Sequence, residues 1–347
     1  MKLLERYQML DEEKRLLLDS ISSFRATMLD DAARELDGSP HSGKVEEVWR
    51  KTSSLGLTSA LLPVESGGQG MDYYSFCLVL SEVARASAGF GALLLSHNLA
   101  LWALERTGEW QPPEHLVNGR ARAALAWPLY IAAGAWEAPF VLGGSNAWGF
   151  VLALPDGGDT YLVAPGDPGV SVVSVEEPLG LRAAVPSGLE VKSAASGEVL
   201  GSIGDGGIEE LEKRLLLGVA ALAHGITRKS YDQSYTYARE RYQGGGSIIG
   251  HQAIRIMLSG MVVGVVSGEP LIRAACSGDG ALRIVECRTV KVLVCERAMA
   301  AASDAVQVHG GYGYMRDYEV ERLMRDAKYL QSYPRSAQEE MLATLVD

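Results

Sequence analysis

The stretch QVHGGYGYMRDYEVERLMRDAKYL, residues 307–330, decides the fold class. It joins two segments whose apolar residues recur at helical spacing, from about Ala281 to His309 and from Glu319 to Leu345. Between them, Gly310 and Gly311 allow a close approach to backbone N–H groups, because glycine has no side chain. The structural interpretation of this pair is a turn between two helices. The functional interpretation is a turn that binds a phosphate group.

Two regions with different patterns lie before the C-terminal helices. Residues 1–118 are predicted to be helical, with a Pro- and Gly-rich loop at 61–73 and with Asp72 as a candidate N-cap for the helix that follows. Residues 119–204 hold short β-rich runs separated by Gly, Pro and Asp, which is typical of antiparallel β structure. These runs lie too close together for crossover helices, which disfavours a doubly wound nucleotide-binding fold.

Residues 205–347 return to long amphipathic helices, which normally pack into a bundle. The expected helices cover residues 211–242, 252–268, 281–309 and 319–345. The chain is therefore predicted to be mainly α-helical with a central β domain. Its three domains would be an N-terminal helical domain (1–118), a reduced antiparallel β domain (119–204) and a C-terminal four-helix bundle domain (205–347).

Composition and charge restrict the classes of function. The formal net charge of −11 argues against general nucleic-acid binding, which depends on a basic surface. The four cysteines show no metal-ligand spacing, so we expect a reduced, cytoplasmic setting. The N-terminus has no apolar core of the signal-peptide type. The uncharged run Ala86–Leu104 is interrupted by Ser96, His97 and Asn98, which favours a buried core helix over a membrane span.

Four segments of this chain resemble the acyl-CoA dehydrogenase family, and the resemblance covers nearly the whole length. The segments are LPVESGGQGMDY (62–73), EEPLGLRAAVPSGLEV (176–191), YARERYQGGGSIIGHQAI (237–254) and the opening stretch, which is the strongest match. The resemblance implies an acyl-CoA dehydrogenase fold, FAD as the cofactor, an acyl thioester as the substrate and an oligomeric assembly.

The resemblance also implies which residues contact the flavin. Arg241, Gln252, Gln307 and Gly311 match residues that one subunit lends to the flavin of its neighbour, and Gly310 adjoins them. Arg241 suits a phosphate, because the guanidinium group of an arginine can donate two parallel hydrogen bonds to it. The alternative is that Arg241 is a solvated surface charge near a helix end. A salt bridge within a helix is not the explanation, because no carboxylate occupies the facing positions.

The position of the family's catalytic glutamate holds Pro334, which has no ionisable side chain. Some branches of the family place the glutamate at the start of a long helix instead, which corresponds here to Leu215; the nearby Glu212 is a weak alternative. Removal of a proton beside a thioester carbonyl needs a positioned base. We therefore predict no catalytic residue of the usual type and a poor dehydrogenase in the isolated chain. Ser336 and Gln338 resemble the polar flavin contacts that follow the glutamate in the family.

Elements that would hold this chain's own flavin are mostly missing. The loop that covers the flavin ring in the family corresponds to ALAWPLYIAAGAWEAPF (124–140), where Pro128 matches but the acid and hydroxyl partners do not. The family's Trp-x-Thr strand is missing, and Trp148 falls in a different predicted strand. In the loop after Arg241, Gly244 replaces an aromatic residue. Residues that serve a neighbour's flavin are thus retained, whereas those that serve the chain's own flavin are lost.

Three interpretations follow. The first is a non-catalytic subunit that lends flavin-binding residues to a partner, either a homologous full-length subunit or a second copy. The second is a homo-oligomeric enzyme with altered chemistry on an acyl thioester, for which Tyr333, Arg335 and His97 are candidates. The third is a structural protein without flavin, which leaves Arg241 unexplained. An oligomer is expected from the apolar and small residues on several faces of 281–309. The sequence leaves open the acyl group and its carrier, coenzyme A or a protein.

Overall fold

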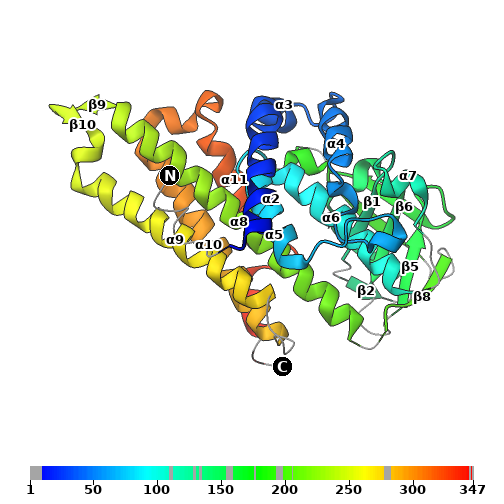
Figure 1. The fold of residues 1–347 in the computed structure, drawn as a ribbon. Helices are drawn as coiled ribbons and strands as arrows, with labels where there is room; N and C mark the ends of the chain where they lie inside the picture. The colour runs from blue at the N-terminus through cyan, green and yellow to red at the C-terminus, as the bar shows by residue number, and fades with distance from the viewer. Residues whose placement is uncertain are drawn as a thin grey trace. The chain divides into compact units, whose positions relative to one another are not determined.

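The computed structural model describes residues 10–108, 112–127, 130–132, 135–153, 159–175, 177–192, 198–204, 206–276, 283–343 and 345. The chain forms two compact units that each combine distant segments of sequence (Figure 1). Unit 1 contains Met1–Arg34, Cys77–Ala88 and Leu216–Asp347, and unit 2 contains Glu35–Phe76 and Gly89–Leu215.

Helices make up most of the described chain, and the strands lie between them in sequence. The α-helices are α2 (Glu12–Phe24), α3 (Asp30–Gly38), α4 (Lys44–Ser54), α5 (Tyr73–Ala84), α6 (Ala88–Arg106), α7 (Glu114–Val117), α8 (Gly207–Glu240), α9 (Gln252–Cys276), α10 (Ile284–His309), α11 (Val320–Ser332) and α12 (Ala337–Ala343). A π-helical turn, η1 (Arg25–Leu29), joins α2 to α3. The 3₁₀ turns are η2 (Leu57–Ser59), η3 (Val64–Ser66), η4 (Gly144–Asn146), η5 (Arg182–Ala184), η7 (Ile248–Gly250), η8 (Gly310–Tyr314) and η9 (Arg316–Tyr318).

Unit 2 contains two four-stranded sheets, with strand orders β1-β4-β5-β8 and β2-β3-β7-β6. The strands are β1 (Ala123–Ala126), β2 (Tyr130–Ala132), β3 (Ala135–Val141), β4 (Gly149–Ala153), β5 (Asp159–Val163), β6 (Val170–Ser174), β7 (Ser187–Val191) and β8 (Glu198–Ser202). All pairs are antiparallel, as predicted, except β1 with β4, which is parallel. This exception arises because β2 and β3, which follow β1 in the chain, belong to the other sheet. When the chain returns to the first sheet as β4, it runs in the same direction as β1.

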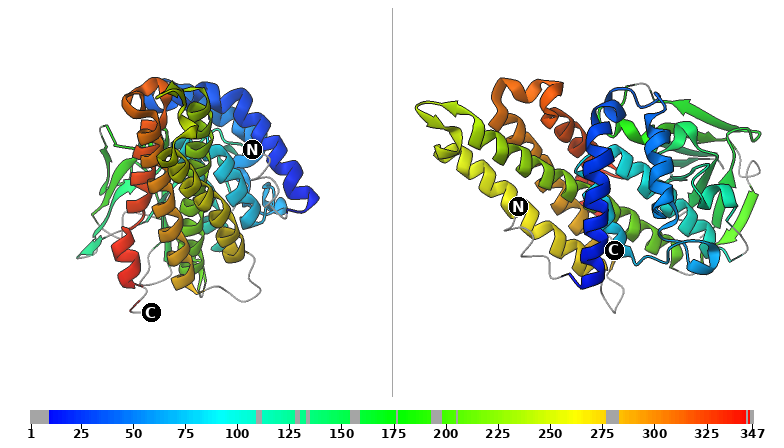
Figure 2. Two further views of the ribbon diagram at one scale, coloured as in Figure 1. Left: turned by 90° about the vertical axis from the view of Figure 1, so that its left-hand side faces the viewer. Right: turned by 45° about the horizontal axis from the view of Figure 1, so that its top comes forward.

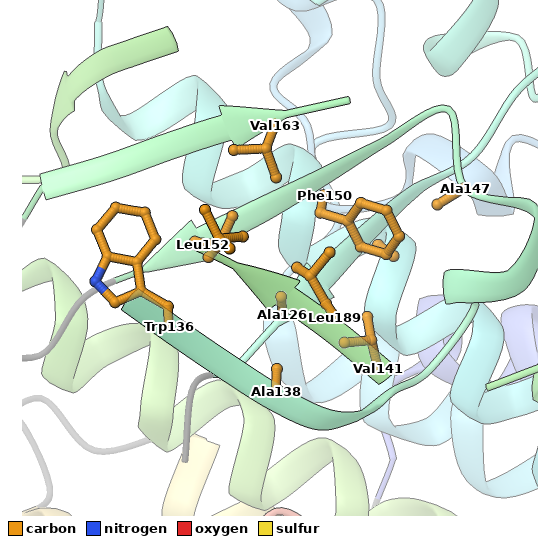
Figure 3. Packing of buried hydrophobic residues seen from close by; sticks show 11 residues of the cluster. Ala126, Trp136, Ala138, Val141, Ala147, Phe150, Leu152, Val163 and Leu189 are labelled. Atoms are coloured by element: carbon orange, nitrogen blue, oxygen red, sulfur yellow. The ribbon is translucent and has the colours of Figure 1, made fainter. Parts of the chain in front are cut away.

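The core of the β domain consists of side chains from both sheets (Figure 3). Strand β3 alternates, so that Trp136 and Ala138 are buried while Glu137 is exposed. Phe150 and Leu152 of β4 are buried in the same cluster, and Leu189 of β7 lies opposite Ala138 in the ladder. This alternation is the pattern expected of a sheet with one buried face.

Helix α6 is buried along most of its length, which confirms a core helix for the uncharged run. His97 lies in the same core, edge-on to the Trp49 ring at 5.1 Å, and its Nδ1 accepts the N–H of Ala123 at 3.0 Å. Burial lowers the pKa of His97 to about 4, so the ring is neutral at pH 7. These contacts give His97 a packing role, which argues against it as a candidate for altered chemistry.

Unit 1 is built around the long helices α8, α9, α10 and α11, which lie side by side in Figures 1 and 2. Glycines on α9 allow the close approach of α8: a Cβ at Gly264 would meet Thr227 at 3.0 Å, and one at Gly268 would meet the His224 ring at 2.8 Å. By length and composition alone, α9 could cross a membrane, and 33% of its most apolar stretch is buried. The buried core helices of soluble bundles can have the same length and hydropathy, so these two properties are weak evidence for a membrane span.

A close helix contact in unit 1 joins α5 to α8. A Cβ added at Gly225 would lie 2.3 Å from the Ser81 carbonyl oxygen, so only glycine fits there. One residue earlier, His224 accepts the Ser81 hydroxyl at Nδ1 (3.1 Å) and donates from Nε2 to the Val265 carbonyl (3.0 Å). This buried imidazole therefore connects α5, α8 and α9.

A cluster of charges surrounds the same contact. Glu82 is almost fully buried and pairs with Arg25 at 2.8 Å, Arg85 at 2.7 Å and Arg228 at 3.0 Å. Arg85 also pairs with Asp232 at 2.7 Å. Burial alone would raise the pKa of Glu82, but the charges of Arg228 and Arg85 and the hydrogen bonds from Arg25 and Arg85 outweigh it and lower the pKa to about 2.

We expect the substitution Gly225→Ala to destabilise the chain by at least about 2 kcal/mol, because its methyl group would overlap the Ser81 carbonyl. Gly260→Ala is the matched control, since this glycine also lies inside a helix but has nothing within 4 Å of an added Cβ. Its expected effect is a gain of about 0.5–1 kcal/mol. Urea unfolding measures both, and equal effects would contradict the packing described.

The pH dependence of stability provides a test of the Glu82 cluster. The lowered pKa means that the ionised carboxylate stabilises the fold above pH 4.5, and this stabilisation is lost as pH falls toward 2. We expect Glu82→Gln to lower the free energy of unfolding at pH 7 by about 3 kcal/mol and to flatten its decline between pH 4.5 and pH 3. Glu47→Gln removes an exposed carboxylate and is the control. Parallel pH curves for the wild type and Glu82→Gln would refute this account of the cluster.

Candidate functional site

A pocket of about 590 Å³ lies in unit 1, where the end of α8, the start of α9 and the end of α10 meet. The strands β9 (Tyr242–Gln243) and β10 (Gly246–Ser247) form a hairpin beside it, and η8 closes the other side. Figure 1 shows this hairpin at the tip of α8 and α9. An apolar cluster that includes Ala238, Ile248, Val306 and Val308 packs beneath these elements.

The hairpin forms because Gly244 and Gly245 both adopt positive φ, at 66° and 88°. Two such residues between paired strands are typical of a type I′ turn. The Ser247 hydroxyl donates to the carbonyl oxygens of Ala238 and Arg239 at 2.7 and 2.9 Å, which satisfies the end of α8. These contacts fix the position of Arg241, which lies between α8 and the hairpin.

The guanidinium group of Arg241 lies over the ring of Tyr312, with 5.6 Å from its carbon to the ring centroid. The side chain is exposed and lines the pocket. Among the residues that the structure describes, Arg241 has no ion pair with a carboxylate. A guanidinium without a counter-charge at a pocket wall is suited to an anion, and above all to a phosphate group.

The glycines that follow α10 differ in backbone conformation and in the space around an added Cβ. Gly310 has φ 58° and ψ −134°, a conformation that other residues rarely adopt, and its N–H donates to the Gln307 carbonyl. At Gly313 an added Cβ would lie 2.5 Å from the Val306 carbonyl oxygen. At Gly311 an added Cβ would meet nothing within 4 Å. Contacts within the described chain therefore require no glycine at 311, which leaves room for the close approach of a ligand.

Aromatic rings form one wall of the pocket. Tyr237 stacks on His309 with centroids 4.2 Å apart, and Tyr318 contacts His309 edge-on at 5.8 Å. The His309 Nδ1–H donates to the Ala305 carbonyl at 2.8 Å, and burial lowers the pKa of the imidazole. His309 is therefore neutral at pH 7, so the positive charge of this site comes mainly from Arg241.

The structure brings four of the seven predicted flavin-contact residues to the pocket: Arg241, Gln307, Gly310 and Gly311. Gln252 does not line the pocket, but it is the first residue of α9 and follows the lining residue His251.

Ser336 and Gln338 lie elsewhere, at the start of α12. The Ser336 N–H donates to the Glu339 carboxylate at 2.7 Å and its hydroxyl accepts the Glu339 N–H at 3.3 Å. This reciprocal pair is a capping box, which gives Ser336 a structural role; Gln338 is exposed.

Pro334 is buried between α11 and α12. The Nζ of Lys291, on α10, donates to the carbonyls of Gln331 (3.1 Å) and Arg335 (2.7 Å), so this buried lysine holds the chain on both sides of the proline. Burial lowers the pKa of Lys291. Glu212 is largely buried in the first turns of α8, within unit 2. Pro128 lies outside the described residues.

Among the lining residues that sequence inspection missed are two tyrosines and two histidines: Tyr237, Tyr312, His251 and His309. One signal was available, because Tyr237 precedes Arg241 by one helical turn and therefore shares its face. His251 donates from Nε2 to the Gln243 carbonyl at 3.2 Å, a contact that depends on the hairpin and has no sequence signature.

Two family models match this chain, together over more than half of its residues. "Acyl-CoA dehydrogenase, N-terminal domain" matches residues 11–117, and "Acyl-CoA dehydrogenase, C-terminal domain" matches residues 212–334. The chain belongs to the acyl-CoA dehydrogenase family. The C-terminal match includes the pocket, and members of this family bind FAD.

Individual acyl-CoA dehydrogenases and their relatives align over most of the chain. An acyl-CoA dehydrogenase of Bacillus subtilis (strain 168) is 30% identical, covering 83% of this chain and 85% of the relative. A 3-(aryl)acrylate reductase of Clostridium sporogenes is 27% identical, covering 93% of this chain and 94% of the relative. The structure of a glutaryl-CoA dehydrogenase from Mycobacterium smegmatis in complex with FADH2 has the same fold, with a TM-score of 0.83 and 19% identity over 98% of this chain and 95% of that chain.

The two glycines of η8 provide a test of the pocket. Gly311→Ala is expected to leave the melting temperature of the chain unchanged, because its methyl group points into open space. Gly313→Ala is expected to lower it by several degrees, since the methyl group would overlap Val306. Thermal unfolding followed by circular dichroism compares them. A destabilising Gly311→Ala would show that this glycine serves packing and would leave it no role in ligand approach.

Proposed function

We propose that this chain is a subunit of a flavin-dependent acyl-CoA dehydrogenase assembly and that it binds the diphosphate part of a flavin held mainly by a partner subunit. One observation carries the proposal: Arg241, which has no ion pair among the described residues, lies in the same pocket as Gly310 and Gly311, where an added Cβ would meet nothing within 4 Å. The forked donors of an arginine and a glycine turn that a ligand can approach closely suit a pyrophosphate.

The residues of the pocket fit a dinucleotide in size as well as charge. A pocket of about 590 Å³ is in the range of small-molecule sites. FAD, when bound, supplies the two-electron redox chemistry that α,β-dehydrogenation of an acyl thioester needs. This chain would contribute Arg241, Gln307 and the Gly310–Gly311 backbone, which bind and orient the diphosphate.

The partner would supply the base. Residue 334 is a proline, and the chain around it is fixed by Lys291, so this loop provides no carboxylate. A missing general base reduces the rate by about 10²–10⁴-fold. Members of the family form homo-oligomers and act on acyl-CoA substrates. We infer that the partner here is a homologous full-length subunit that carries the glutamate.

A second candidate is a homo-oligomeric enzyme with altered chemistry on an acyl thioester, carried by coenzyme A or by a protein. The relative from Clostridium sporogenes favours it, because a reductase aligns with this chain from end to end. In this case the partner is a second copy of the chain. The two candidates differ in whether the isolated chain binds flavin. For both we propose a cytoplasmic location, which agrees with four cysteines that form no disulfide in the part of the chain that the structure describes.

Arg241→Ala tests the proposal in an assembly of this chain with a full-length acyl-CoA dehydrogenase subunit. We expect flavin affinity to fall at least about tenfold, because one or two charge-assisted hydrogen bonds of about 1.5–3 kcal/mol each are lost. Arg241→Lys should rescue the affinity only in part, since a lysine lacks the forked geometry.

The measurement is the flavin-to-protein ratio after gel filtration, together with the melting temperature of each variant. Arg239→Ala is the matched control: it is an exposed arginine on the same helix whose guanidinium lies over Tyr235 and does not line the pocket. Full flavin occupancy in Arg241→Ala would overturn the proposal. A yellow, flavin-loaded chain without any partner would favour the second candidate.

A further inference from the structure

The guanidinium of Arg241 lies over the ring of Tyr312. The separation of 5.6 Å from the ring centroid is within the range of cation–π attraction. Tyr312 is 42% exposed, so its burial alone does not explain why the ring takes this place.

The ring of Tyr312 is itself supported on the protein side. Its centroid lies 5.2 Å from that of Tyr318, with 41° between the planes. Tyr318 contacts Tyr237 edge-on at 5.9 Å, and Tyr237 lies one turn before Arg241 on α8. A continuous set of ring contacts therefore connects the helix that carries Arg241 with the turn that carries Tyr312.

A cation–π contact uses none of the hydrogen-bond donors of a guanidinium and leaves its N–H groups for an anion. The contact also restricts the rotamers of an exposed arginine before the ligand binds. An arginine that is already ordered loses less side-chain entropy on binding, and this raises the affinity.

We propose that Tyr312 is a positioning residue, whose ring orders the Arg241 guanidinium so that its N–H donors are available to a diphosphate. This inference rests on the proposed function of the pocket. It assigns to Tyr312 a role that acts through Arg241 and needs no direct contact between the tyrosine and the ligand.

The experiment measures the binding of inorganic pyrophosphate to the full-length chain by ³¹P NMR titration. Pyrophosphate has no ring, so a loss of affinity cannot come from stacking of a base on Tyr312. The variants are Tyr312→Leu, Tyr312→Phe, Arg241→Ala and the double variant Tyr312→Leu/Arg241→Ala. Tyr314→Leu is the matched control, because Tyr314 lies on the same turn and is 80% exposed.

Tyr312→Leu is expected to weaken pyrophosphate binding about three- to tenfold, while Tyr312→Phe and Tyr314→Leu stay within about twofold of the wild type. In the Arg241→Ala background, Tyr312→Leu should have no further effect, because the group it positions is gone. This non-additivity separates a positioning role from a structural one, which would persist without Arg241.

Each other outcome decides against a specific claim. Wild-type affinity in Tyr312→Leu, with weak binding by Arg241→Ala, would overturn the role of Tyr312 and leave the proposed function standing. Weak binding by Tyr312→Phe would show that the hydroxyl contacts the ligand, which also overturns a positioning role. Unchanged binding by Arg241→Ala, or no binding by the wild type, would overturn this inference together with the proposed function.

Discussion

Unit 1 depends on the contact between α5 and α8, where Gly225 lies against the Ser81 carbonyl and Glu82 is surrounded by arginines. A buried carboxylate is costly unless it is paired, and Glu82 is paired with three arginines. The cluster therefore fixes which faces of the two helices meet. Because α8 is one continuous helix of 34 residues, this contact also determines where its far end lies.

The far end of α8 borders the candidate site. Tyr237 and Arg241 lie on one side of the pocket, and the turn after α10 carries Gly310 and Gly311 on the other. The glycines of the chain fall into two classes here. Gly225, Gly264, Gly268 and Gly313 are glycine because a neighbouring atom leaves no room for a Cβ. Gly311 has open space where a Cβ would lie, so contacts within the described chain set no requirement for glycine there.

Sequence patterns predicted the order of helices, β domain and helices, because that order depends on local periodicity. Asp72 is confirmed as an N-cap, since it accepts the Ser75 N–H at 3.0 Å. The predicted end of α9 at Gly268 is wrong: the helix continues to Cys276, because this glycine accommodates the ring of His224. The last predicted helix is divided into α11 and α12 by a loop that Lys291 holds. Both differences come from contacts between distant residues, which local pattern does not contain.

In the candidate site, too, features that depend on local sequence could be predicted, whereas contacts between residues distant in sequence could not. The motif at 307–330 and the arginine at 241 were visible in the sequence, because the family retains them in fixed spacing. Ser336 matches a flavin-contact position, which stays a prediction, and the sequence Ser-Ala-Gln-Glu also forms a capping box in the structure. The stacking of Tyr237 on His309 and the cation–π contact of Arg241 with Tyr312 depend on how α8 and α10 meet, so sequence alone could not reveal them.

The most direct test of the central claim is an experimental structure, by electron cryo-microscopy, of the flavin-loaded assembly of this chain with its full-length partner. The account predicts the diphosphate of the partner's flavin within hydrogen-bond distance of the Arg241 guanidinium, beside Gly310 and Gly311, with the flavin ring held by the partner. A flavin bound wholly within one chain, with the Arg241 pocket empty or covered by protein, would contradict it.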